Sequence, residues 1–107
     1  MRVMISQPMN GLTEAQIKEA KYKAEEYLVS QGHFVIDTYF NDAWVNKEAM
    51  LERGVLHVPV AFLAKAIESM ATCDAMYFIE GWEHARGCKL EHEIAKAYGL
   101  VMMYHAH

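Results

Sequence analysis

Residues 74–98 read DAMYFIEGWEHARGCKLEHEIAKAY and predict a strand, a loop and a helix in succession. Residues 74–79 are mostly apolar, as in a buried strand, and residues 80–86 are polar and turn-rich. Gly87 then begins a helix that continues to the end of the stretch. Glu91 thereby falls in the first helical turn at the carboxyl end of a strand, where open α/β sheets bind their ligands.

The same alternation of strand and helix extends over the rest of the chain. The other elements we expect are a strand at Arg2–Ser6, a helix from a Thr13–Gln16 capping box to Gly32, a strand at 33–36, one helical turn at 47–53, a helix from Pro59 to about Cys73 and a strand at 100–104. Strands that alternate with helices predict a parallel sheet with right-handed crossovers. We therefore expect residues 1–107 to form one domain, a small flavodoxin- or Rossmann-like three-layer α/β sandwich with strand order 2-1-3-4. The loops at 7–11 and 80–87 should then meet at the switch point of the sheet.

Composition limits the classes of function. The 107 residues are 53% hydrophobic and 22% charged, as in a globular domain. Ten basic and fourteen acidic residues give a net charge of −4 without a basic block, which argues against binding a nucleic-acid polymer. No window approaches the roughly 20 apolar residues of a membrane span, so no membrane association is expected.

Cysteine and histidine usage narrows the chemistry further. The two cysteines, Cys73 and Cys88, have no metal-site spacing and form no disulfide framework, which favours reduced thiols and a cytoplasmic location. The six histidines are scattered without an HExxH pattern, so no metal site is expected.

Glu91 is the candidate catalytic residue. Near the positive end of a helix dipole a carboxylate tends to stay ionised, as a nucleophile in glycosyl chemistry must be. The alternative is that an acidic residue stands there for dipole reasons alone. Leu90, Ile94 and Ala97 mark the predicted apolar stripe of the helix and place Glu91 on its flank.

Residues of the two loops are candidate substrate contacts. Gly87 would offer its amide to an anion at the helix N-terminus, or serve only as a flexible helix entry. Arg86 would pair with a phosphate, or be an ordinary surface arginine. Ser6, Asn10 and Gly11 would face the same site from the first loop, or reflect simple turn chemistry.

More than one role is possible for three further residues, Trp82, Glu83 and Cys88. Trp82 would stack on a base, with Glu83 accepting hydrogen bonds from its edge; alternatively, Trp82 packs over the sheet edge. Cys88 lies close to a helix start, where the pKa of a thiol can fall, with His84 or His92 as a candidate base.

Two parts of the chain resemble the nucleoside 2-deoxyribosyltransferase-like superfamily, in a short and little-characterised branch. They are residues 5–11, ISQPMNG, and the run of motifs at 73–77, 81–83, 85–88 and 91–95. The resemblance implies a Rossmann-like sheet and cleavage of the N-glycosidic bond of a 2′-deoxynucleoside or its 5′-monophosphate, without a cofactor. Glu91 matches the nucleophile that forms a covalent deoxyribosyl-enzyme. The positions that line the sugar or phosphate site in the family match Ser6, Gly11 and Gly87.

The resemblance also implies homo-oligomers that complete each other's sites, and residues 39–44 are the candidate contact. The chain departs from the family pattern at Met4, where a tyrosine often orients the nucleophile, and at Ala66, where an acidic residue is common. Trp82 stands in the place of the base-reading acid, for which Glu83 is a substitute. These departures leave a non-catalytic nucleotide-binding module as the second hypothesis, and a structural partner protein as a third.

Overall fold

The computed structural model describes residues 1–36 and 47–105. Its elements are β1 (Arg2–Ser6), α1 (Glu14–Ser30), β2 (Phe34–Val35), α3 (Lys47–Glu52), α4 (Val58–Met70), β3 (Ala75–Phe78), a short 3₁₀ helix η1 (Trp82–His84), α5 (Arg86–Tyr98) and β4 (Val101–Tyr104). The strands form one parallel sheet in the order β2-β1-β3-β4, which confirms the predicted fold class and topology.

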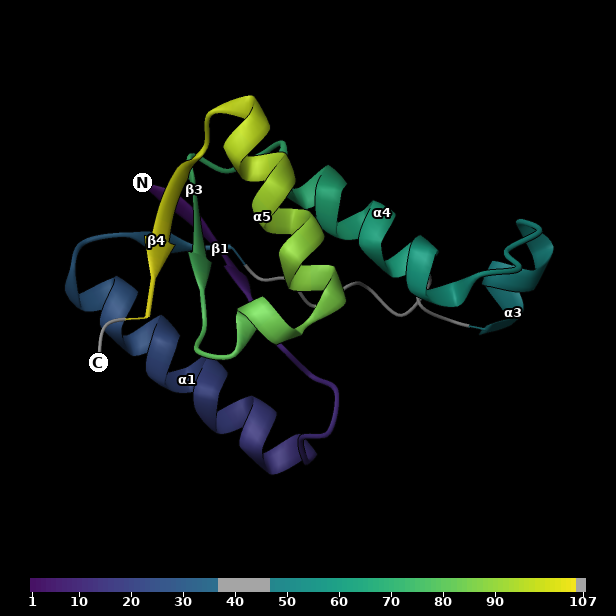
Figure 1. The fold of residues 1–107 in the computed structure, drawn as a ribbon, viewed down its shortest axis with the longest axis horizontal. Helices are drawn as coiled ribbons and strands as arrows, with labels where there is room; N and C mark the ends of the chain where they lie inside the picture. The colour runs from purple at the N-terminus through teal and green to yellow at the C-terminus, as the bar shows by residue number, and fades with distance from the viewer. Residues whose placement is uncertain (37–46, 106–107) are drawn as a thin grey trace.

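The sheet is the middle of three layers (Figure 1). Alternate residues of β1 point to opposite faces, so Val3 and Ile5 join a core cluster with α1, while Met4 joins the core with α4 and α5. Ser6 follows the same alternation and faces α5. In the described residues, α1 alone covers one face, α4 and α5 cover the other, and α3 lies beyond α4, away from the sheet (Figure 1).

Local signals begin and end α1 as predicted. The Thr13 hydroxyl accepts a hydrogen bond from the Gln16 amide at 3.1 Å, and the Gln16 side chain accepts one from the Thr13 amide at 2.9 Å, so both bonds of a capping box are present. Gly32 follows the last turn with a φ of +82°, a left-handed conformation that favours glycine.

The two predicted loops do meet at the carboxyl end of the sheet. Ser6 and Phe78, the last residues of β1 and β3, are partners in the strand register. Just beyond them, a methyl group built on Gly81 would lie 3.6 Å from Cγ of Pro8. The switch point predicted from the sequence is therefore present.

Several predicted boundaries differ from the structure. β2 covers two residues rather than four, and α4 ends at Met70 rather than near Cys73. α5 begins at Arg86, not Gly87, because Ala85 is still extended and serves as its N-cap. The helical turn predicted at 47–53 is present as α3. The predicted contact at 39–44 lies outside the described residues.

Candidate functional site

The carboxyl group of Glu91 lies at the switch point, on the α5 face of the sheet. The Ser6 hydroxyl, 85 residues earlier in the chain, donates a hydrogen bond to Glu91 Oε1 at 3.3 Å. Glu91 is 9% exposed and Ser6 is 1% exposed. Two of the predicted site residues are therefore brought together by the packing of α5 over the end of β1.

Burial controls the charge of Glu91. Loss of solvent raises the pKa of its carboxyl group from 4.5 to about 7, and the hydrogen bond from Ser6 opposes this rise. The prediction of a carboxylate kept ionised in the first helical turn is wrong. Glu91 is the sixth residue of α5, in the second turn, where the helix dipole has weakened and desolvation is the larger effect.

The predicted apolar stripe of α5 is confirmed at Ile94, which packs against the core, and is wrong at its other two positions. Leu90 and Ala97 are exposed, whereas Cys88, Glu91 and Ala95 are the buried residues of the helix. These three follow an i, i+3, i+7 spacing, which marks one helix face. The sequence contains this spacing, but the bulky apolar side chain of Leu90 indicated a position that is exposed in the structure.

Cys88 lies one turn before Glu91 on that buried face. Burial raises the pKa of its thiol to about 11; an interaction with Ser6 lowers it, and the charge of Glu91 raises it further. The alternative in which Cys88 is an activated thiol with a lowered pKa is therefore contradicted. A thiol with so high a pKa is protonated at neutral pH and is a poor nucleophile. Glu91 therefore remains the candidate functional group of this face.

Trp82 belongs to an aromatic cluster at the sheet edge. Its ring stacks on His92 with centroids 4.2 Å apart and an interplanar angle of 17°, and its centroid lies 5.3 Å from that of Phe78. His92 Nε2 is in turn 2.7 Å from the Tyr104 hydroxyl. This packing matches the alternative in which Trp82 covers the sheet edge, and one face of its ring is occupied by His92.

Trp82 and Glu83 also line an open hollow of about 280 Å³, which we term the edge hollow. Its other lining residues come from the ends of β3 and β4: Phe78, Glu80, Tyr104 and His105. Glu91 does not line this hollow. The structure therefore keeps the two predicted base contacts together but does not join them to Glu91 in one cavity.

The remaining predicted contacts lie on the surface. Arg86 and Gly87 are exposed in the first turn of α5, whose N-cap residue makes no side-chain hydrogen bond to that turn. Asn10 and Gly11 are exposed in the turn after β1, where Gly11 has a φ of +79° that only glycine adopts readily. Among the described residues, the side chain of Glu91 is hydrogen-bonded by Ser6, and no side-chain hydrogen bond joins it to any of these four.

The two departures from the family pattern lie in the protein core. Met4 and Ala66 are both buried in the cluster under α4 and α5, so neither supplies a polar group to Glu91. Within 1–36 and 47–105, no three histidine, cysteine or acidic side chains are grouped to hold a metal ion. In the same residues, no helix combines the length and apolar character needed to cross a membrane.

Fold and site together define a small parallel α/β protein with a buried, hydrogen-bonded carboxyl group at the switch point of its sheet. Residues 1–104 match the family described as a domain of unknown function, DUF4406, and the chain belongs to that family. No curated protein and no solved structure matches the chain significantly.

Proposed function

We propose that the protein cleaves or transfers at the N-glycosidic bond of a 2′-deoxynucleoside or its 5′-monophosphate, with Glu91 as the nucleophile. The observation that carries the proposal is the buried Glu91 carboxyl group at the switch point, held by Ser6 from the end of β1. This is the place where open α/β sheets bind ligands. A carboxylate shielded from water is also suited to stabilise positive charge that develops beside it.

The proposed reaction is a double displacement. A Glu91 oxygen attacks C1′ of the sugar while the C1′–N bond breaks, and the bonding electron pair leaves with the base. Water or a second base then attacks C1′ and releases the carboxylate, which gives hydrolysis or transfer with net retention. Glu83 is the proposed contact to the departing base. The first-turn amides of α5, with Arg86, are the proposed holders of a 5′-phosphate.

The ionisation of Glu91 makes the mechanism dependent on pH. The attack requires the carboxylate, and a pKa of about 7 leaves about half of the free protein in that form at neutral pH. We therefore expect kcat/KM to fall as pH decreases through 7, because this ratio reports the ionisation of the free enzyme. A profile that stays flat between pH 5 and pH 8 would argue against Glu91 as the nucleophile.

A non-catalytic nucleotide-binding module is the second candidate function, and a specific observation favours it. Met4 and Ala66 are apolar and buried, so Ser6 is the one described side chain that hydrogen-bonds Glu91. A nucleophile held by a single bond is less well oriented, and poor orientation lowers rates by orders of magnitude. In a binding module, Glu91 would hydrogen-bond the ligand without attacking it.

A base-release assay separates the two candidates. Each 2′-deoxynucleoside and 2′-deoxynucleotide is incubated with the protein, with and without a second free base, and the products are separated by chromatography. We expect release that is lost in Glu91→Gln and kept in Glu93→Gln, which changes an exposed glutamate on the same helix. A swapped base marks transfer, and free deoxyribose or its phosphate marks hydrolysis. Ligand binding without release would assign the protein to the binding-module class.

The proposal also includes the cellular location of the protein, its need for a cofactor and its oligomeric state. Cys73 and Cys88 are both free, in keeping with a cytoplasmic location and reduced thiols. The reaction as written requires no cofactor. Association with a second copy that completes the site is part of the proposal, and sedimentation velocity of the protein with and without a deoxynucleotide tests it.

A further inference from the structure

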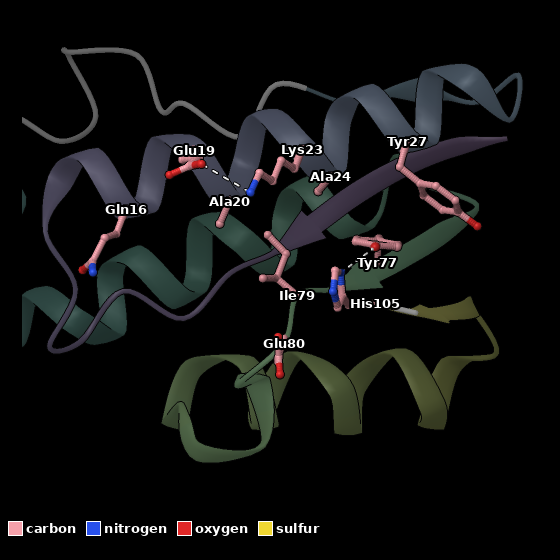
Figure 2. Close-up of a pocket in the computed structure, with 10 residues that line it drawn as sticks. All are labelled: Gln16, Glu19, Ala20, Lys23, Ala24, Tyr27, Tyr77, Ile79, Glu80 and His105. Carbon is pink, nitrogen blue, oxygen red and sulfur yellow. Dashed lines mark hydrogen bonds and ion pairs between the residues drawn. The ribbon is translucent and has the colours of Figure 1, made fainter. Parts of the chain in front are cut away.

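A larger hollow lies on the opposite face of the sheet from Glu91, between α1 and the end of β3 (Figure 2). We call it the α1 groove. Its volume is about 460 Å³, within the range of small-molecule sites. It is lined from α1 by Ala20, Ala24 and Tyr27, and from β3 and the residue after it by Tyr77 and Ile79 (Figure 2). The groove therefore has an apolar floor with two aromatic rings.

The topology of the sheet explains why this groove exists. Parallel sheets normally carry helices on both faces. Here α4 and α5 cover one face, whereas α1 is the one helix that the described residues place on the other (Figure 1). On that face α1 packs over β1 and β3, and within 1–36 and 47–105 no second helix lies beside it. A hollow is left where a second helix would otherwise pack.

Polar groups surround the apolar floor. On α1, Lys23 Nζ pairs with Glu19 Oε1 at 3.3 Å, and Glu80 and His105 stand at the carboxyl ends of the strands (Figure 2). The Tyr77 hydroxyl lies 3.4 Å from His105 Nδ1. Among the lysine and glutamate side chains of the lining, two carboxylates stand against one ammonium group. A negative lining disfavours phosphate and favours an uncharged or cationic molecule.

The tyrosine pair indicates where a flat ring would lie. The Tyr27 and Tyr77 ring centroids are 6.0 Å apart with an interplanar angle of 38°, so a ligand ring cannot be sandwiched between them. Tyr27 is nevertheless 48% exposed, which leaves part of its ring open to a partner. A planar ligand would stack on that ring and direct its N–H groups towards the carboxylates at the rim.

We propose that the α1 groove binds a flat aromatic molecule that is uncharged or cationic and carries N–H donors, stacked on Tyr27. This site is separate from the proposed glycosidic site, because it lies on the other face of the sheet and shares only Glu80 and His105 with the edge hollow. It does not rest on the proposed function, and either one can fail without the other.

Three probes of graded charge test the proposal by isothermal titration calorimetry on the full chain. Adenine is uncharged, benzamidine is a cation, and AMP carries the adenine ring with a phosphate. We expect adenine and benzamidine to bind, and AMP to bind about fivefold more weakly than adenine because the lining is negative. Tyr27→Ala should weaken adenine binding about tenfold, a usual effect of removing one aromatic stacking partner. Tyr22→Ala is the matched control, since Tyr22 is 65% exposed on the same helix and does not line the groove.

Two further variants keep the test decisive. Glu19→Lys reverses one rim charge at an exposed position, so it should weaken benzamidine about threefold and strengthen AMP, even if Tyr27→Ala folds poorly. Trp82→Ala separates the two sites, because adenine bound in the α1 groove does not touch Trp82, whereas adenine bound in the edge hollow does. Adenine binding lost in Trp82→Ala but kept in Tyr27→Ala would overturn the proposal and support the glycosidic site instead. Failure of both adenine and benzamidine to bind would also overturn it.

Discussion

Replacing Glu91 with glutamine should stabilise the protein at pH 8 and leave its stability nearly unchanged at pH 4.5. The carboxyl group is buried, and its pKa rises from 4.5 to about 7 on folding. Between these two values the folded state holds a proton that the unfolded state releases. The free energy of unfolding therefore decreases as pH rises through this window and levels off above pH 7.

The size of the effect follows from the two pKa values of Glu91. The interval between 4.5 and about 7, at about 1.4 kcal/mol for each pH unit, corresponds to about 3 kcal/mol. Glutamine keeps the size of the side chain and an acceptor for the Ser6 hydroxyl, but it cannot ionise. Above about pH 7.5 the Glu91→Gln variant should therefore be more stable than the wild type by up to about 3 kcal/mol, a large part of the total stability of a small domain.

Urea unfolding followed by circular dichroism, repeated from pH 4.5 to pH 8.5, measures this difference directly. Other titrating groups contribute equally to both proteins and cancel in the comparison. Glu93→Gln, which removes an exposed carboxyl group two residues away, should show no such pH dependence. A difference between Glu91→Gln and the wild type that is constant with pH, or a variant less stable at pH 8, would refute the argument from burial.

Other parts of the structure make three further predictions. Ser6→Ala removes the hydrogen bond that opposes the effect of burial, so the pKa of Glu91 should rise above 7. A carbon-13 NMR titration of the Glu91 carboxyl resonance measures this pKa, and an unchanged midpoint would contradict the role of Ser6. At pH 8 a disulfide reagent should modify the partly exposed Cys73 well before Cys88, which is buried and has a pKa of about 11. Peptide mass spectrometry measures the two modification rates, and equal rates would be inconsistent with the burial of Cys88. Thr13→Ala should cost about 1 kcal/mol through loss of the α1 cap, measured by denaturant unfolding, and a cost near zero would show that the cap is not needed.

The fold was predictable because its signals are local. The capping box at Thr13, the glycine at Gly32 and the apolar run before Gly81 each specify an element from a few neighbouring residues. Once strands alternate with helices, chirality and short connections leave few topologies open. The approach of the loop after β1 to the loop after β3 then follows from the strand order, and it places Ser6 within reach of Glu91.

The charge states of the site were not predictable in the same way. The dipole argument for Glu91 and the helix-start argument for Cys88 both consider α5 alone, whereas the pKa of each group is dominated by burial against the sheet. Trp82 shows the same limit. One face of its ring stacks on His92, which lies ten residues later in α5. One interpretation of the sequence had assigned the Trp82 ring to stacking with a ligand.

By itself, the sequence determined the order of the elements, the parallel sheet and the position of Glu91 at its carboxyl edge. Only the tertiary structure decided that Glu91 is mostly buried with a raised pKa, which face of α5 packs on the sheet, and that a groove remains beside α1. The physical reason is that periodicity and capping depend on residues within one or two turns, while desolvation depends on which distant segments cover a side chain.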